Sequence, residues 1–387
     1  MQRTMLVGIA MLMIAAGGNQ RVGGQAPGAP GAKQIPLFEV DPTFFKLPSG
    51  WVMANGASVA VDRHDNVWVL GRSSQTNAVG EIAPPLMQFD STGNYVQGWG
   101  GTPQGACDWV QREHGIFIDH EGYVWFSSTT RRGRGPDGSV LSDDFLSKWT
   151  ADGTCVMQIG KPNASKGPRD TTTVHGASDM FVYPKTNELF VSDDGNLRVI
   201  VFDADTGAFK RMWGAFGDPP PEKGMVVAEG SNGDLPAHRP VPITTGPGPR
   251  TFDLPHGLEV SNDGFVYVTD RSNSRVQVFT LEGTYVTQAF FNRTLPAPTG
   301  SVVGIAFSND PEQRFMYLCD YGNGHIIVAE RKTLEVLYQF GQPTEKPGDV
   351  RMPHQMATDS KGNLFVAETA PGNRVQRFVL KGFGWTE

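Results

Sequence analysis

The sequence predicts an all-β protein that folds as one six-bladed β-propeller. Four short runs rich in Val, Phe, Tyr and Leu, separated by turn residues, are clearest over residues 254–286. Alternating β-branched and aromatic residues between such turns are typical of an antiparallel meander. The pattern returns in five further copies, over residues 58–100, 115–160, 178–217, 304–341 and 355–380. Four strands in each of six copies, with no long helical periodicity, indicate the blades of a propeller.

The sixth copy is one strand short, because only residues 381–387 follow its third strand. The segment Ile35–Phe45, ahead of the first copy, is apolar enough to supply a fourth strand. Pairing it with the last copy would close the ring without a covalent link and would protect the strand edges. We therefore expect residues 35–387 to form a single propeller domain.

Residues 1–26 have the features of a signal peptide. Arg3 precedes the apolar run Met5–Ala16, and small residues follow it, with cleavage near residue 17 or near residue 25 left open. The run is too short to span a membrane as a mature helix. Residues 27–34, rich in Gly and Pro, are predicted to be a tether. We expect a secreted or periplasmic protein with no membrane span in the mature chain.

The composition limits the partners that this protein can have. A net charge of −7 and a pI near 5.7 argue against a nucleic-acid surface, which needs clustered Lys and Arg. We expect a monomer that binds no nucleic acid. Cys107 lies just before the second copy and Cys155 lies in its last strand, so a disulfide and two free thiols are both open. Cys319 is predicted to be a small buried side chain.

Histidines occupy one equivalent position in every second copy of the repeat. Alternate members of a six-membered ring lie about 120° apart, so these imidazoles are expected to converge on the axis. Three neutral imidazoles that leave one position open are typical of a catalytic zinc site. The plainer alternative is that each histidine is a structural turn residue. In chain order, the equivalent positions hold Ala57, His114, Ser178, His256, Val303 and His354.

A second set of side chains is expected on the same face, at the turn after the second strand of each blade. Arginine there suits a substrate carboxylate, because its guanidinium offers a fixed fork of donors. The long segments Ser128–Asp144 and Asp218–Arg250 emerge nearby and are predicted to be either lids or plain surface. His175 falls about three residues short of the histidine register and is predicted to be a loop residue. The turn positions, called the rim below, are Arg72, Asp194, Arg271, Tyr321 and Thr369.

The units resemble NHL repeats, most plainly over Phe265–Phe279 and Leu364–Glu368, and the resemblance runs over about residues 50–380. The histidine pattern is similar to that of peptidyl-α-hydroxyglycine α-amidating lyase, the lyase domain of peptidylglycine α-amidating enzymes. His114, Pro255–Leu258 and Met352–His354 match its motifs. The resemblance implies that the three histidines bind zinc. It also implies that Arg72 and Arg271 belong to the active site.

Two departures from that family concern the catalytic base and a second metal. The family has a catalytic tyrosine in the turn of its third blade, where this chain has residues 192–198 without a tyrosine. Either Tyr321 or Asp194 is expected to replace it. The family also places an aspartate after its last zinc histidine to hold structural calcium. Gln355 stands there in this chain, so zinc is the expected cofactor and calcium is not.

The implied reaction is cleavage of a carbinolamide, R-CO-NH-CH(OH)-COO⁻, into an amide and glyoxylate. Arg72 and Arg271 would hold the carboxylate of a small-molecule or peptide substrate. Two alternatives of other classes stay open at this point. One is a metal-dependent hydrolase of lactones or esters, and the other is a metal-free propeller that serves as a binding scaffold.

Overall fold

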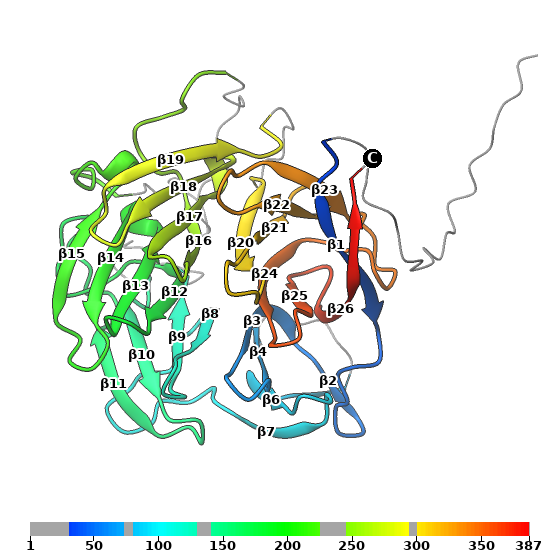
Figure 1. Cartoon of the computed structure of the whole chain (residues 1–387). Helices are drawn as coiled ribbons and strands as arrows, with labels where there is room; N and C mark the ends of the chain where they lie inside the picture. Colours follow the sequence, from blue (N-terminus) through cyan, green and yellow to red (C-terminus); the bar gives the residue numbers. More distant parts are fainter. Residues whose placement is uncertain (1–30, 73–79, 130–140, 225–244, 294–299, 387) are drawn as a thin grey trace, which may run out of the picture.

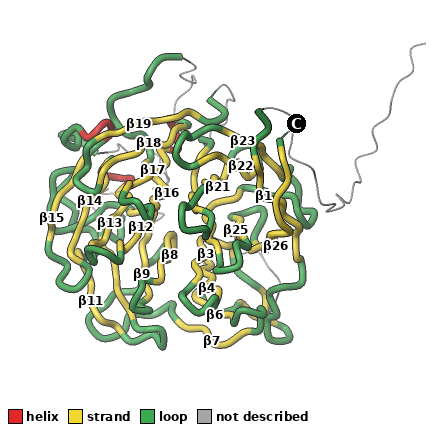
Figure 2. The backbone as a smooth tube through the Cα atoms, viewed as in Figure 1, coloured by secondary structure: helices red, strands yellow, loops and turns green. Residues whose placement is uncertain are grey.

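The computed structural model describes residues 31–72, 80–129, 141–224, 245–293 and 300–386. Its strands form six four-stranded antiparallel sheets around one axis, as Figures 1 and 2 show. The predicted six-bladed propeller is therefore confirmed. Residues 1–26, predicted as the signal peptide, and residues 27–30 of the tether lie outside the described residues. Within the described ranges, no helix has the length and apolar character to cross a membrane.

Each blade is listed from its innermost strand outward. Blade one consists of β3 (Asn55–Val61), β4 (Val67–Arg72), β6 (Leu86–Phe89) and β7 (Tyr95–Trp99). Blade two consists of β8 (Glu113–Ile118), β9 (Val124–Ser128), β10 (Phe145–Trp149) and β11 (Cys155–Gly160). Blade three consists of β12 (Ala177–Tyr183), β13 (Glu188–Asp193), β14 (Arg198–Asp203) and β15 (Phe209–Trp213).

The remaining blades follow the same plan. Blade four consists of β16 (Pro255–Val260), β17 (Phe265–Asp270), β18 (Arg275–Thr280) and β19 (Tyr285–Phe290). Blade five consists of β20 (Val302–Phe307), β21 (Phe315–Asp320), β22 (His325–Glu330) and β23 (Val336–Phe340). Blade six consists of β24 (Pro353–Thr358), β25 (Leu364–Glu368), β26 (Arg374–Trp385) and β1 (Gln34–Asp41). The short elements are β2 (Trp51–Val52), β5 (Glu81–Ile82), η2 (Asp194–Asn196), η3 (Ala215–Gly217) and η4 (Arg271–Asn273).

The ring closes between the two ends of the chain. β1 pairs antiparallel with β26, from Gln34 opposite Trp385 to Asp41 opposite Arg377. Figure 1 shows β1 as the outer neighbour of β26. The predicted closing segment is confirmed, although the strand begins one residue earlier than expected and β26 runs on to Trp385. β1 thereby covers the outer edge of β26 from Arg377 to Trp385.

Repeated side-chain contacts explain why the turns recur. Asp119 accepts hydrogen bonds from the backbone of Glu121 and Tyr123, at 3.0 and 2.9 Å, and from the indole of Trp125 at 2.8 Å. The carboxylate thus fixes the turn between two strands. Asp62 and Asp359 make the same backbone contacts in their own blades.

Arginines tie the second strand of three blades to the third. Arg275 donates to Asp270 at 2.8 Å, and Arg198 and Arg374 pair in the same way with the last residues of β13 and β25. These arginines therefore have a structural role. The pairing also assigns Asp270 to Arg275, not to its neighbour in sequence, Arg271.

Aromatic side chains fill the space between blades one and two. Trp109 packs within 5.0 Å of Phe126 and 6.1 Å of Trp99, measured between ring centroids. Cys107 and Cys155 are bonded beside this cluster, with their Cα atoms 5.7 Å apart, so the disulfide alternative holds. Cys319 is buried and unbonded, as predicted. Large buried areas of this kind stabilise the blades independently of the axial side chains.

Candidate metal centre

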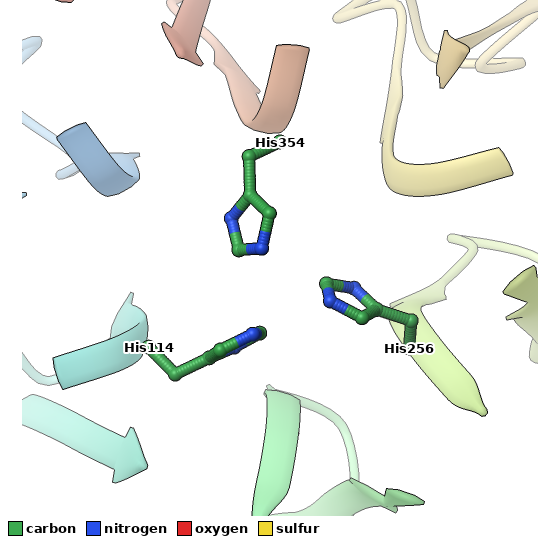
Figure 3. Close-up of side chains that lie close together, drawn as sticks. All are labelled: His114, His256 and His354. Carbon is green, nitrogen blue, oxygen red and sulfur yellow. The ribbon is translucent and has the colours of Figure 1, made fainter. Parts of the chain in front are cut away.

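The three histidines each stand second in an innermost strand, in β8, β16 and β24. Figure 3 shows that they come from three directions and point toward one another. The strand pairing is irregular at this position, for example between Pro255 and Leu258 of β16. An irregularity of this kind re-aims a side chain out of the sheet. The three other innermost strands have it as well.

The imidazoles are close enough to share one ion. Their ring centroids are 4.7–4.9 Å apart, and one nitrogen from each ring lies within 4.8 Å of the other two. Bonds of about 2.0–2.1 Å to a tetrahedral zinc would separate the nitrogens by about 3.3 Å. Closing on an ion therefore requires each pair to approach by at most about 1.5 Å, which small rotations of the side chains provide.

Two of the rings are held by the intervening blades. His114 Nδ1 lies 2.8 Å from the carbonyl oxygen of Ser178, and His354 Nδ1 lies 2.6 Å from that of Ala57. Ser178 and Ala57 occupy the position that is equivalent to the histidines. Donation from Nδ1 to a carbonyl leaves Nε2 as the unprotonated nitrogen that faces the axis. Two blades that lack an axial histidine thus orient the imidazole rings of His114 and His354 through their backbone carbonyls.

His256 differs from the other two histidines. The equivalent carbonyl, that of Val303, accepts a hydrogen bond from Thr269 Oγ1 at 2.7 Å. Both ring nitrogens of His256 are buried and have no hydrogen-bond partner among the described residues. Buried polar atoms without a partner are rare and costly, and an ion at the axis would satisfy one of the two. The donor set and this unmet nitrogen fit zinc.

Burial lowers the pKa of all three imidazoles well below the usual value for histidine. The positive charge of Arg72 lowers the pKa of His114 further, and the neighbouring imidazoles lower those of His256 and His354. The rings are therefore neutral near pH 7, which is the form that ligates a metal.

The rim places a stacked pair beside the histidines. The guanidinium carbon of Arg271 lies 4.5 Å from the centre of the Tyr321 ring, and that ring lies 6.0 Å from the ring of His354. The hydroxyl of Tyr321 is 3.1 Å from that of Thr369. The structure thus brings together the predicted residues Arg271 and Tyr321, with Thr369 as a hydrogen-bond partner.

Arg72 adds a second positive charge on the same side. It is buried, and its Nε donates to the carbonyl of Glu113 at 2.7 Å. Burial, with the nearby charges of Arg112 and Arg271, lowers its pKa to about 10. Arg112, two residues before His114, was not predicted as a rim residue, because it lies outside the strand register. A cationic environment next to neutral imidazoles favours an anionic ligand group.

Asp194 is the acidic member of the rim and is almost completely buried. Its Oδ2 accepts a hydrogen bond from Ser178 Oγ at 2.8 Å, and its Oδ1 has no partner within the described ranges. Burial raises its pKa to about 7. A carboxyl with this pKa can accept and return a proton at neutral pH.

The two long segments, predicted to be either lids or plain surface, are described only in part. Residues 130–140, which include Arg131, Arg132 and Arg134, and residues 225–244, which include His238, lie outside the described residues.

The other half of the channel has a different chemistry. A cavity of about 310 Å³ is lined by residues of all six innermost strands, including Asp179, Glu259 and Gln355. Burial raises the pKa of Asp179 to about 7 and that of Glu259 well above its usual value. Gln355 carries no charge at the place where calcium would need a carboxylate.

Comparisons with known proteins agree with this architecture. The model of the NHL repeat matches residues 252–279. Human NHL repeat-containing protein 3 is 24% identical over 88% of this chain and 86% of its own length. Rat peptidylglycine alpha-amidating monooxygenase is 24% identical over 69% of this chain, which is 23% of that protein. The solved structure of a streptogramin B lyase superposes with a TM-score of 0.52 at 12% identity, covering 89% of this chain and 98% of that one, and it shows the shared fold alone.

Proposed function

We propose that this protein is an exported, zinc-dependent carbon–nitrogen lyase that cleaves an α-hydroxyglycine-type carbinolamide into an amide and glyoxylate. The observation that carries the proposal is the set of three buried imidazoles, His114, His256 and His354, with ligand nitrogens within 4.8 Å of one another. The distant similarity to a peptidylglycine alpha-amidating monooxygenase supports this choice of substrate class. The substrate is a small molecule or peptide that carries a carboxylate, and the protein acts as a monomer.

The three imidazoles would hold zinc with one position open toward the rim. Zinc bound there would supply a Lewis acid that polarises the substrate hydroxyl. The protein itself supplies neutral donors in fixed orientations, because the carbonyls of Ser178 and Ala57 hold two of the rings. Buried surroundings keep those donors neutral and exclude competing water.

Arg271 and Arg72 would bind the substrate carboxylate. Stacking on Tyr321 holds the plane of the Arg271 guanidinium, and a planar fork matches the two oxygens of a carboxylate. Arg72 is anchored through its Nε to Glu113, which orients its terminal nitrogens. The two cations would place the α-carbon of the substrate between the rim and the histidines.

Asp194 would act as the base that removes the hydroxyl proton. Its Oδ1 is buried without a partner among the described residues, and burial raises its pKa to about 7. A substrate hydroxyl would satisfy that oxygen. Tyr321, the other candidate from the sequence, stacks on Arg271 and so has a positioning role.

A second candidate is a binding scaffold without catalysis. The longer similarity, to human NHL repeat-containing protein 3 over 88% of this chain, leaves this candidate open because that name specifies a repeat and no reaction. The scaffold makes no use of buried, converging imidazoles, and this is why we place the lyase first.

The test combines metal analysis with turnover. Purified protein should contain about one zinc per chain and should release glyoxylate from benzoyl-α-hydroxyglycine. Protein with neither metal nor turnover would favour the scaffold. Hydrolysis of neutral esters or lactones without glyoxylate release would favour the metal-dependent hydrolase.

A further inference from the structure

The turn of blade three has no aromatic side chain of its own, and the imidazole of His175 lies over it. The backbone N–H of His175 donates to Asp193 at 2.7 Å, and the N–H of Gly195 donates to the carbonyl of His175 at 2.9 Å. A Cβ at residue 195 would lie 2.4 Å from Cδ2 of the imidazole. Glycine therefore makes room for the ring. The ring therefore packs against the turn that carries Asp194 through Cδ2 and Cγ.

A buried carboxylate holds the opposite edge of the ring. His175 Nδ1 lies 2.8 Å from Asp144 Oδ1, and the side chain of Asp144 is only 3% exposed. The second oxygen of Asp144 accepts the backbone N–H of Ser165 at 2.9 Å. This arrangement fixes the tautomer and orientation of the imidazole, as a carboxylate does in a hydrolase triad. Nε2 is left as the nitrogen that exchanges protons.

The charges around His175 favour its protonated form. Burial alone would lower its pKa, but the hydrogen bond to Asp144 and the charges of Asp144, Asp193 and Asp194 raise it above the usual value. His175 in turn lowers the pKa of Asp194, which burial has raised to about 7. The two side chains therefore interact electrostatically: Asp194 raises the pKa of His175, and His175 lowers that of Asp194. A histidine and a carboxyl coupled in this way are suited to exchanging a proton.

We propose that His175, oriented by Asp144, is the general acid that protonates the departing amide nitrogen in this reaction, an assignment that rests on the proposed lyase function. Asp194 takes the proton of the substrate hydroxyl, and the C–O bond becomes a carbonyl as the C–N bond breaks. The electron pair of that bond leaves on nitrogen, which receives the proton of His175 Nε2. The products are the amide and glyoxylate. Transfer of the proton from Asp194 to His175 then restores both groups.

The first test is His175→Gln, with His120→Gln as its matched control. His120 is exposed and lies at the other mouth of the channel. His175→Gln should lower kcat about 100-fold or more, the contribution of a general acid, while zinc content and KM stay within about twofold. The loss of kcat should be smaller with para-nitrobenzoyl-α-hydroxyglycine than with benzoyl-α-hydroxyglycine. The para-nitrobenzamide is the better leaving group, so its nitrogen needs less protonation. An unchanged kcat, or an equal loss with both substrates, would overturn the assignment.

The second test addresses Asp144 as a positioning residue and does not depend on turnover alone. Asp144→Asn removes the charge that raises the pKa of His175, so the alkaline limb of the kcat profile should move to lower pH. Proton NMR of the zinc-free protein should show the same fall in the His175 pKa, with the resonance assigned by its absence in His175→Gln. If the pKa of His175 and the alkaline limb of the kcat profile both stay unchanged in Asp144→Asn, Asp144 does not control the protonation of His175.

The two proposals fail in different ways. A wild-type protein that yields no glyoxylate would refute the lyase function, and the role of His175 as its acid would fall with it. A wild-type protein that yields glyoxylate, together with a fully active His175→Gln variant, would refute only the role of His175.

Discussion

The two halves of the central channel share the same six strands and differ in chemistry. At the strand starts, His114, His256 and His354 face the axis, with Arg72 and Arg271 around them. Further along, Asp179 and Glu259 line a cavity of about 310 Å³. Burial shifts the pKa values in opposite directions, down for the imidazoles and up for the carboxyls. Both halves are thereby driven toward neutral side chains.

The difference lies in what surrounds each set. The arginines lower the pKa values of His114 and His354 in addition to burial. The histidine end therefore combines neutral imidazoles with fixed positive charge. Among the described residues, the groups that shift the pKa of Asp179 are two backbone amides and Gln355, and Glu259 is affected by Asp179. The comparison teaches that the strands fix where a side chain stands, while its neighbours determine its charge. Among the described residues, it is the histidine end that combines side chains able to hold a metal ion with two arginines.

The largest expected effect is at the histidine end. His256→Ala should lower zinc affinity at least about 100-fold and abolish glyoxylate release, because two imidazoles cannot hold the ion as three do. The fold should survive, since the blades are held by their strands and interfaces. Metal content, turnover and circular dichroism measure these outcomes. Asp179→Asn is the matched control at the acidic end and should keep its zinc. Loss of folding in His256→Ala would support the structural alternative.

Acid should release the metal. The ligands must be neutral, and burial holds their pKa well below about 6.5. Zinc affinity should therefore change little between pH 8 and 6.5 and then fall by about tenfold or more per pH unit once the imidazoles protonate. Competition with a chromophoric chelator across this range measures the affinity. Half-release above pH 6.5 would show that the imidazoles are not buried donors.

Arg271→Lys tests the anion site. Lysine keeps the charge but loses the planar fork, so the preference for a carboxylate substrate over its amide analogue should narrow by about tenfold. The measured quantity is the ratio of the two kcat/KM values in each protein. Neutral esters serve as the control, since they offer nothing to clamp. An unchanged ratio would show that Arg271 does not bind the substrate carboxylate and would weaken the case for a carboxylate substrate.

The smallest effect is expected at the acidic end. The folded pKa of Asp179 is raised to about 7, so the stability it contributes is fully present below the unfolded value near 3.8 and is lost as pH rises through about 7. Asp179 is half-buried in the channel, where water screens the penalty. Asp179→Asn should reduce the loss of unfolding free energy between pH 4 and 8 by about 1–2 kcal/mol. Urea unfolding at the two pH values measures it, and equal losses in both proteins would refute the shift.

The sequence predicted what strand periodicity controls. Six copies of one pattern placed the histidines in register, and the turn after each second strand placed Arg72, Arg271 and Tyr321 at the rim. His175 could not be assigned in this way, because it lies outside its strand and reaches the rim only through the space that Gly195 leaves. Its partner Asp144 is 31 residues away in sequence, and no local pattern joins the two. The lack of a hydrogen-bond partner at His256 was likewise not predicted, because it depends on a contact between blades. Thr269 Oγ1 donates to the carbonyl of Val303 in the next blade, which is equivalent to the carbonyls that hold the other two histidines.

Closure by β1 and β26 has a consequence for the order of folding. The pair joins Gln34 to Trp385, so the last blade cannot be completed until the chain has been made through β26. Contacts between residues so far apart form slowly, because a long loop must be closed before they contribute. The histidines come from blades two, four and six, and the ring that aligns them is complete only then. We therefore expect zinc to bind late in folding, after the propeller has nearly closed. Zinc should then stabilise the closed ring without having been needed to form it.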